Sequence, residues 1–299
     1  MGLVRTPEER LDDLPGYPYD PAFVEVGEDD ARMAYVDEDG GAEETFLCLH
    51  GEPTWGYLYR KMLPTLADEG RVVVPDFVGF GRSDKYDEVE EYTFEMHYES
   101  LVAFVEALDL QNVTLVCQDW GSILGLPVAA NEFPERFSRI VAMNAVLADG
   151  TVDMPEVWYR FKELVETTDD FQVSRLVQSG CETPLSPGVR AAYDAPYHDD
   201  ASKAGAYAWP PMVPRDPDAP GAAHLREARE ALGEWEKPFF ALFGDADPIT
   251  REFRTLLRDL VPSATEQPDV WVEGAGHFIQ EDAGGRTAEQ IVEFVRRTR

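Results

Sequence analysis

Residues 113–126, VTLVCQDWGSILGL, predict a strand, a sharp turn and a helix in immediate succession. Residues 113–117 are β-branched or apolar, which is typical of a strand buried on both faces. Residues 118–121 contain two polar side chains and a glycine and predict the turn. A helix is expected from about Ser122. The other predicted elements can be placed relative to this strand–turn–helix unit.

The turn presents Asp119 at its exposed position. A strand, a tight turn and a helix form the nucleophile elbow of hydrolases, and the small residues Cys117 and Gly121 flank the position that usually holds serine. A carboxylate with an ordinary pKa near ~3.9 is already a nucleophile at neutral pH. Asp119 could therefore displace a leaving group from carbon and become an alkyl ester. The alternative is that Asp119 only caps the following helix.

The length and composition indicate one large domain, or a domain with an insertion. The first 16 residues have no apolar core, and no run approaches 18 apolar residues, so neither a signal peptide nor a membrane span is predicted. Cys48 and Cys117, two of the three cysteines, fall in predicted strands. They indicate buried free thiols in a reducing compartment, and we expect a cytoplasmic protein.

The net charge of −32 is unusual, with 58 acidic residues against 26 basic ones. The acidic residues are spread over every surface segment, which favours a halophilic protein whose self-repulsion is balanced by a salt-rich cytoplasm. Ordinary acidic solubility is the alternative. A strong negative field repels nucleic acid and anionic membranes, so neither is expected as a partner.

Strands alternate with helices over most of the chain. Predicted strands lie at residues 24–26, 33–36, 46–50, 72–75, 113–117, 140–144, 239–244 and 270–272, and predicted helices at 55–66, 93–108, 251–260 and 286–297. This alternation predicts an α/β fold with a mostly parallel central sheet flanked by helices. The pattern stops at about Leu147 and resumes after residue 232. We therefore expect residues 1–147 and 233–299 to form the core and residues 148–232 to form an inserted helical cap.

Three loops follow predicted strands at the edge of the sheet where ligands gather. In the first, Gly51 allows a turn that would direct the amide of Glu52 into the site. Together with the amide of Trp120, directly after Asp119, it could form an oxyanion hole. The alternative is an ordinary turn that packs against the sheet.

The other two loops supply an acid and a histidine. Asp245 and Asp247 follow residues 239–244, and Asp247 is favoured because it is the last before the chain turns away. His277 lies in a glycine-rich loop near the C-terminus. The order Asp119, Asp247, His277 is that of an α/β-hydrolase triad, in which the histidine would activate water for the second step. No histidine pair has metal-ligand spacing, so neither a metal nor another cofactor is expected.

At this point the sequence resembles the haloalkane dehalogenases. The resemblance covers most of the chain and is carried by HGEPTWGYLYRKM (50–62), VVPDFVGFGRSDK (73–85), LVCQDWG (115–121), MNA (143–145) and GAGHFIQE (274–281), with a looser match at GDAD (244–247). It implies an α/β-hydrolase fold with a helical cap. The implied reaction hydrolyses the carbon–halogen bond of small haloalkanes to an alcohol, a halide ion and a proton through a covalent aspartyl ester. The expected partners are the haloalkane, water and halide, and a monomer is expected.

The resemblance also implies roles for individual residues. Asp119 would be the nucleophile, His277 the base and Asp247 its acidic partner. The amides of Glu52 and Trp120 would form the oxyanion hole, and the Trp120 indole N–H would bind the leaving halide. An indole N–H donates without accepting, which suits a weakly hydrated anion.

Some positions depart from the family pattern or rest on it alone. Asn144 stands where another branch keeps its acid, and an asparagine cannot replace it, which favours Asp247. Relatives bind the halide with a second tryptophan from the cap, where this chain has Phe161; Trp158 lies three residues earlier on the same predicted helix face. Trp158 is therefore expected to supply the second halide donor; the alternative is that this donor is missing. The substrate pocket is expected to involve Ile123, Phe161, Trp209, Pro210 and Ile249.

Two other functions share parts of this sequence pattern. Epoxide hydrolases share the aspartate elbow and open their substrate with cap tyrosines, and the cap region here contains Tyr159, Tyr193, Tyr197 and Tyr207. The sequences HGEPTW and QDWG favour the dehalogenase. A non-catalytic binding protein of the same fold would not need the complete set of two aspartates and a histidine.

Overall fold

The computed structural model describes residues 2–27, 31–41 and 43–299. An eight-stranded sheet lies at the centre, in the order β10-β9-β8-β7-β4-β5-β3-β2. All neighbours from β10 to β5 are parallel, while β3 pairs antiparallel with β5 and with β2. The strands are β2(Ala22–Val26), β3(Ala31–Glu38), β4(Thr45–Leu49), β5(Arg71–Pro75), β7(Val113–Asp119), β8(Phe137–Ala145), β9(Phe239–Gly244) and β10(Trp271–Val272). The expected α/β fold is confirmed.

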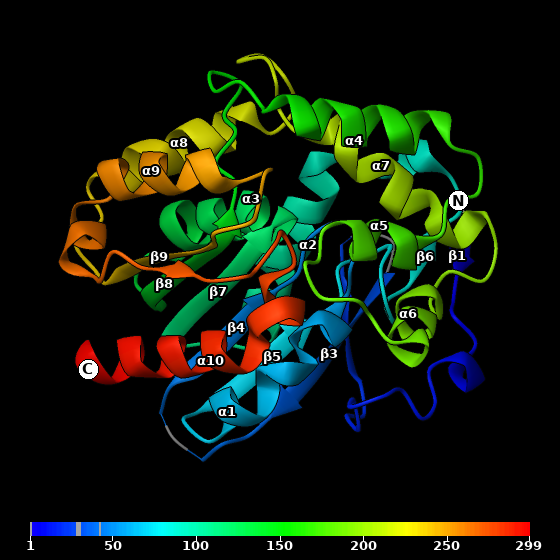
Figure 1. Ribbon diagram of the computed structural model, residues 1–299, viewed down its shortest axis with the longest axis horizontal. Helices are drawn as coiled ribbons and strands as arrows, with labels where there is room; N and C mark the ends of the chain where they lie inside the picture. Colours follow the sequence, from blue (N-terminus) through cyan, green and yellow to red (C-terminus); the bar gives the residue numbers. More distant parts are fainter. Residues whose placement is uncertain (1, 28–30, 42) are drawn as a thin grey trace.

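Helices cover both faces of this sheet (Figure 1). On one face lie α1(Leu63–Ala67) and α10(Ile279–Arg297), which contact each other. On the other lie α2(Phe94–Ala107), α3(Trp120–Pro127), α8(Ala222–Gly233) and α9(Arg251–Leu260). A two-stranded sheet, β1(Leu3–Val4) with β6(Lys85–Tyr86), ties down the N-terminus. Short helices are η1(Glu8–Arg10), η2(Gly56–Lys61), η3(Val89–Glu91), η4(Val128–Glu132), η5(Ala201–Lys203) and η6(Pro262–Glu266).

Between β8 and β9, where every residue is described, the chain forms helices and no strand. Besides the short η5, these helices are α4(Glu156–Thr167), α5(Val173–Ser179), α6(Pro187–Asp194), α7(Ala204–Met212) and α8. The first four gather at one end of the molecule, whereas α8 packs against α3 and α9 on the face of the sheet (Figure 1).

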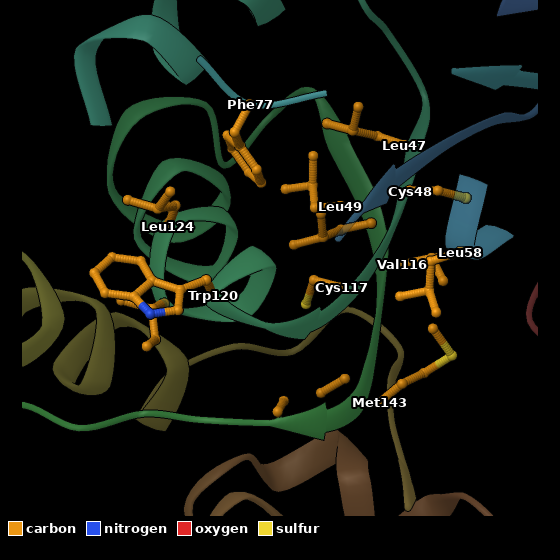
Figure 2. Packing of buried hydrophobic residues seen from close by; sticks show 14 of the residues in the cluster. Leu47, Cys48, Leu49, Leu58, Phe77, Val116, Cys117, Trp120, Leu124 and Met143 are labelled. Carbon is orange, nitrogen blue, oxygen red and sulfur yellow. The ribbon is translucent and has the colours of Figure 1, made fainter. Parts of the chain in front are cut away.

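The core is continuous across the sheet. Figure 2 shows Leu49 on β4 and Cys117 on β7 close to the first turns of α3, whereas Val116 on β7 and Met143 on β8 lie on the other side of the strands. Cys48 and Cys117 are buried and free, as the sequence predicted. Burial of these apolar side chains is the main favourable term for folding.

Some element boundaries differ from the sequence predictions. The last helix begins at Ile279 rather than at residue 286, with non-helical dihedrals at Ala283 inside it. The glycines at 284 and 285 lowered the expected helix propensity there. However, a Cβ at Gly284 would lie 2.9 Å from the Lys61 side chain. Close packing against Lys61 therefore explains why a glycine stands inside this helix. The predicted helix at 55–66 is a 3₁₀ segment, η2, followed by the short α1.

Candidate active site

The strand–turn–helix unit places Asp119 at a constrained backbone position. Asp119 ends β7 with φ 51° and ψ −122°, and α3 begins at the next residue. A positive φ is uncommon outside glycine and is found at functional turns. The surrounding chain approaches very closely: a Cβ at Gly121 would lie 2.3 Å from the Leu49 carbonyl oxygen, and one at Gly51 would lie 2.4 Å from Asp119. Both glycines are therefore required by the turn.

A backbone amide binds the Asp119 carboxylate. The Glu52 N–H donates to Asp119 Oδ1 at 2.8 Å. Trp120 is the first residue of α3, so its amide has no acceptor within the helix. The sequence predicted an oxyanion hole from these two amides. The amide of Glu52 contacts Asp119 in space, and the amide of Trp120 directly follows Asp119 in the chain.

His277 lies between two carboxylates. Its Nδ1 is 3.3 Å from Asp247 Oδ2, and its Nε2 is 3.6 Å from Asp119 Oδ2. Burial lowers the pKa of the imidazole, but the charges and hydrogen bonds of Asp247 and Asp119 outweigh burial, so the net pKa is raised. The three predicted triad residues are therefore brought together at the ends of β7, β9 and β10.

Asp247 is the aspartate that faces the histidine. It is fully buried and accepts hydrogen bonds from the Ile249 N–H at 2.8 Å and from the Thr250 hydroxyl. Burial raises the pKa of Asp247, but the His277 charge and these hydrogen bonds lower it overall. Asp245, its competitor in the sequence, instead accepts from the Gly274 N–H at 2.7 Å and serves the turn.

Asn144 supports the histidine loop. Its Nδ2 donates to the carbonyls of Gly276 and His277, each at 2.8 Å, and its Oδ1 accepts from the Gly244 N–H at 2.9 Å. The sequence predicted only that Asn144 is not the acid. A fully buried amide in an apolar strand needs partners, and this requirement is the signal that could have revealed its role.

A cavity of about 220 Å³ opens beside Asp119 and His277. Its other walls come from loops at the strand ends and from helices α4, α5 and α7. The lining residues are Glu52, Pro53, Asp119, Trp120, Val157, Trp158, Phe161, Leu176, Ser179, Gly180, Glu182, Pro210, Ala246, Pro248, Ile249, Gly276, His277 and Phe278. A larger open groove of about 980 Å³ lies along the N-terminal arm and contains none of the predicted site residues.

The predicted pocket residues divide into two groups. Phe161, Pro210 and Ile249 line the cavity, but Ile123 and Trp209 do not. Ile123 is buried in the core because α3 packs against β4, β7 and β8 after its first turn. Trp209 is fully buried and stacks on Trp120, with ring centroids 4.8 Å apart. The prediction that Ile123 and Trp209 line the pocket is therefore wrong.

Two tryptophans reach the cavity, Trp120 from the elbow and Trp158 from α4. Within the described part of the chain, no hydrogen bond engages either indole N–H. Both donors are therefore available to a ligand. The sequence did not predict the α5 side of the wall, where Leu176, Ser179 and Glu182 contribute, because the loop after α5 carries no recognisable motif.

Glu52 contributes a third carboxyl group to the cavity wall. Only 5% of the residue is exposed, and both carboxyl oxygens are buried without a hydrogen-bond partner among the described residues. Burial, with a smaller contribution from the Asp119 charge, raises the pKa of Glu52 well above its ordinary value. An unpaired buried carboxylate is strongly unfavourable, so this group is held neutral.

The four cap-region tyrosines lie outside the cavity lining. The hydroxyl of Tyr193 donates to Glu281 at 2.5 Å, and those of Tyr197 and Tyr207 donate to backbone carbonyls at 3.2 Å. Tyr159 is 41% exposed on α4. None of these hydroxyls is directed at Asp119.

In the described ranges, no group of three or more histidine, cysteine or acidic side chains could hold a metal ion. Among the helices of the same ranges, none has the length and apolar character needed to cross a membrane.

Known proteins with a similar sequence or structure identify the family. The sequence profile described as alpha/beta hydrolase fold matches residues 44–284, and together with the sheet order and the elbow at Asp119 it defines an α/β hydrolase. A haloalkane dehalogenase from Psychrobacter cryohalolentis is 39% identical over 99% of this chain and 98% of its own length. Haloalkane dehalogenase 1 from Mycobacterium tuberculosis is 43% identical over the whole of both chains.

A solved structure agrees with these relatives. The tetrameric haloalkane dehalogenase DpaA from Paraglaciecola agarilytica superimposes with a TM-score of 0.91 at 39% identity, over 97% of both chains. The chain therefore belongs to the haloalkane dehalogenases, hydrolases that act on carbon–halide bonds. The expected family, fold and activity are confirmed.

Proposed function

We propose that this dehalogenase works through a covalent ester on Asp119, with His277 and Asp247 completing the triad. The observation that carries the proposal is the position of the Asp119 carboxylate at the cavity wall. One of its oxygens accepts from the Glu52 amide at 2.8 Å, and the other lies 3.6 Å from His277 Nε2. In the first step an Asp119 oxygen forms a bond to the halogen-bearing carbon, and the halide leaves with the bonding electron pair.

The leaving halide is stabilised by indole donors in this proposal. Trp120 and Trp158 both line the cavity, and their N–H groups can donate to an anion without offering a competing acceptor. Negative charge grows on the halogen during bond breaking. Donors placed at that atom therefore stabilise the transition state more than the neutral substrate.

His277 acts in the second step. It takes a proton from water, and the resulting hydroxide attacks the carbonyl carbon of the Asp119 ester. The amides of Glu52 and Trp120 stabilise the tetrahedral oxyanion. Its collapse releases the alkoxide, which takes the proton from His277, and the regenerated Asp119 carboxyl group loses its proton to solvent. The sum is a haloalkane and water converted to an alcohol, a halide ion and a proton.

Ester formation also adjusts the base. In the resting enzyme two carboxylates face the imidazole and raise its pKa. The ester of Asp119 carries no charge, so one of these contributions disappears when the intermediate forms. The pKa of His277 then falls, and the ring becomes available as a base at the step that needs it.

In the inserted segment 148–232, between core segments 1–147 and 233–299, helices α4 to α7 would serve as the cap, while α8 packs on the sheet with the core. Support comes from α4, α5 and α7, which contribute Trp158, Leu176 and Pro210 to the cavity wall. A cavity of about 220 Å³ is smaller than the roughly 300–1,000 Å³ typical of pockets for drug-sized ligands, which suits small haloalkanes.

Epoxide hydrolysis is the weaker candidate for the same elbow. Opening an epoxide requires an acid at the departing oxygen, and the cap tyrosines that could supply it are outside the cavity lining. A non-catalytic binding role would leave the buried His277–Asp247 pair without a purpose.

The cellular setting and assembly belong to the same proposal. A net charge of −32 favours a halophilic protein of a salt-rich cytoplasm. The same self-repulsion favours the monomer, although the relative DpaA is described as a tetramer. Light scattering at low and high salt distinguishes the two, and a salt-independent tetramer would contradict the monomer.

The mechanism is tested with a His277→Phe variant incubated with 1,2-dibromoethane in high salt. Without the base, the ester should form and persist, so intact mass and peptide mapping should find a bromoethyl group on the Asp119 peptide together with released bromide. The variant that also carries Asp119→Asn is the control and should remain unmodified. An adduct formed only from a small epoxide would favour the epoxide hydrolase. A folded variant that forms neither adduct would contradict the nucleophile.

A further inference from the structure

A buried amide contacts the histidine on the side away from Asp247. Gln118, the residue before Asp119 on β7, is fully buried. Its Nε2 lies 3.2 Å from His277 Nε2 and 3.3 Å from the carbonyl oxygen of His277. Its Oε1 has no hydrogen-bond partner in the described part of the chain. The proposed mechanism assigns no role to this side chain.

The contact has a definite chemical requirement. An amide NH₂ group can only donate hydrogen bonds. For this contact to be a hydrogen bond, His277 Nε2 has to accept, which requires a neutral imidazole with its proton on Nδ1, the nitrogen 3.3 Å from Asp247. In the imidazolium, a ring N–H would point at the amide N–H, and the contact would be repulsive. The amide thus favours the tautomer that can take a proton from water.

The amide is held in this orientation by the histidine loop itself. If the Gln118 amide turned over, its Oε1 would face the His277 carbonyl oxygen, placing two acceptors together. That carbonyl is fixed by the Nδ2 of Asn144, which donates to it at 2.8 Å. The donor of Gln118 is therefore kept against the ring.

The charged groups that face the imidazole act in the opposite direction. They are Asp119 from the elbow and Asp247 from the loop after β9, and both carboxylates favour the imidazolium. Glu52, from the loop after β4, is the remaining carboxyl group at this end of the cavity and is held neutral by burial. The imidazolium forms an ion pair with Asp119, and the Gln118 amide opposes this charged form of the ring.

We propose that Gln118 is a positioning residue that favours the neutral, Nδ1-protonated tautomer of His277 and so opposes the two carboxylates that favour the imidazolium. This role rests on the proposed function for the part that His277 plays as a base. It would serve both steps of the reaction. A neutral ring leaves the Asp119 oxygen free to attack carbon, and it can accept the proton of water during ester hydrolysis.

The test measures the resting protein and does not depend on turnover. His277 is titrated by NMR in protein with labelled histidine, in the wild type and in Gln118→Met, which keeps the length but loses the donor. The proton affinity of His277 should rise about tenfold, as expected for the loss of one hydrogen bond to the neutral form. Val116→Ala, on the same face of β7, should leave the titration unchanged. An unchanged or weaker proton affinity in folded Gln118→Met would overturn the proposal.

A second variant and a second measurement complete the test. If Gln118→Met does not fold, Gln118→Asn retains the amide but is too short to reach Nε2, and it should shift the titration in the same direction. Single-turnover kinetics should show the acid limb of ester hydrolysis moving to higher pH in either variant. If no ester forms on Asp119 in any protein, the proposed mechanism fails, while the titration still decides the role of Gln118.

Discussion

The indole of Trp209 stacks on that of Trp120, with ring centroids 4.8 Å apart and an interplanar angle of 21°. The Trp209 N–H donates to His97 Nε2 at 2.7 Å. Burial lowers the pKa of His97 to about 3, so its ring is neutral and can accept this bond. Trp120 lines the cavity and Trp209 does not. The plane of the proposed halide donor is therefore fixed by two residues that the substrate never touches.

Replacing Trp209 by leucine should weaken halide binding without removing a cavity residue. Aromatic pairs contribute about 0.5–1.5 kcal/mol beyond their burial, so losing the stack should lower the bromide affinity by at most about tenfold. Calorimetric titration with bromide measures the change. Trp235→Leu removes another buried tryptophan, one outside the cavity lining, and is the matched control. Equal losses in the two variants would show that the stack has no specific effect.

Removing the indole donors separately should show which of them bind halide. Trp120→Phe is expected to lower the rate of ester formation by about 10²-fold, by analogy with the loss of one oxyanion-hole donor. Trp158→Phe should also weaken bromide binding if Trp158 is the second donor. Rapid-quench kinetics and bromide titration measure the two effects. Wild-type behaviour of Trp158→Phe would mean that a single indole holds the halide.

Neutralising Asp119 should lower the pKa of His277. Burial opposes the charged ring, and the two carboxylates that raise its pKa are Asp247 and Asp119. Asp119→Asn removes one of these charges and mimics the neutral ester. NMR titration of labelled histidine should show the midpoint at lower pH than in the wild type. Asp245→Asn, which alters a carboxylate bonded to the Gly274 N–H, is the control. A higher midpoint in Asp119→Asn would contradict this account of the base.

Glu52 should make the protein less stable as the pH rises. Its folded-state pKa is raised well above the ordinary value of 4.5, so the unfolded chain ionises while the folded protein stays neutral. The stabilisation is complete below pH 4.5 and is lost at up to about 1.4 kcal/mol per pH unit until the folded pKa is reached.

Urea unfolding at several pH values compares the wild type with Glu52→Gln, which lacks this titration. The free energy of unfolding of Glu52→Gln minus that of the wild type should increase as the pH rises above 4.5. Glu182→Gln, at an exposed position of the cavity wall, should show no such gain. Parallel curves for the wild type and Glu52→Gln would mean that Glu52 is ionised in the folded protein.

Salt should stabilise the folded protein. With 58 acidic and 26 basic residues, repulsion between surface carboxylates opposes the compact state, and added ions screen it. The urea midpoint should rise steadily between about 0.05 and 2 M KCl. Sulfate at matched ionic strength separates screening from any effect of bound chloride. A midpoint independent of both salts would contradict the halophilic interpretation.

The sequence was most informative where backbone position decides the outcome. Asp119, Asp247 and His277 follow predicted strands, and the carboxyl ends of parallel strands meet at one edge of a sheet. Their proximity therefore followed from three apolar runs and their loops. The glycines beside them were equally predictable, since the turns leave no room for a Cβ.

Side-chain partners across distant segments could not be predicted in this way. Trp209 was expected in the pocket wall from its position in the family, but whether an aromatic residue there faces the cavity or the back of Trp120 depends on how α7 docks. The contact of Gln118 with His277 joins residues 159 positions apart, and no local pattern records it. The early start of α10 was not predicted because Gly284 lowers the helix propensity. A glycine is needed there because the Lys61 side chain packs against it.

Asn144 has a consequence for how this lineage can evolve. The Asn144 amide donates to two carbonyls of the histidine loop and accepts from the Gly244 N–H. A carboxylate at position 144 has no N–H to donate, so one of its oxygens would face these two carbonyl oxygens. The acid of the triad therefore cannot migrate from the loop after β9 to β8 by single substitutions. Every intermediate would either disorder the histidine loop or lack the acid, which separates the two arrangements by a fitness valley.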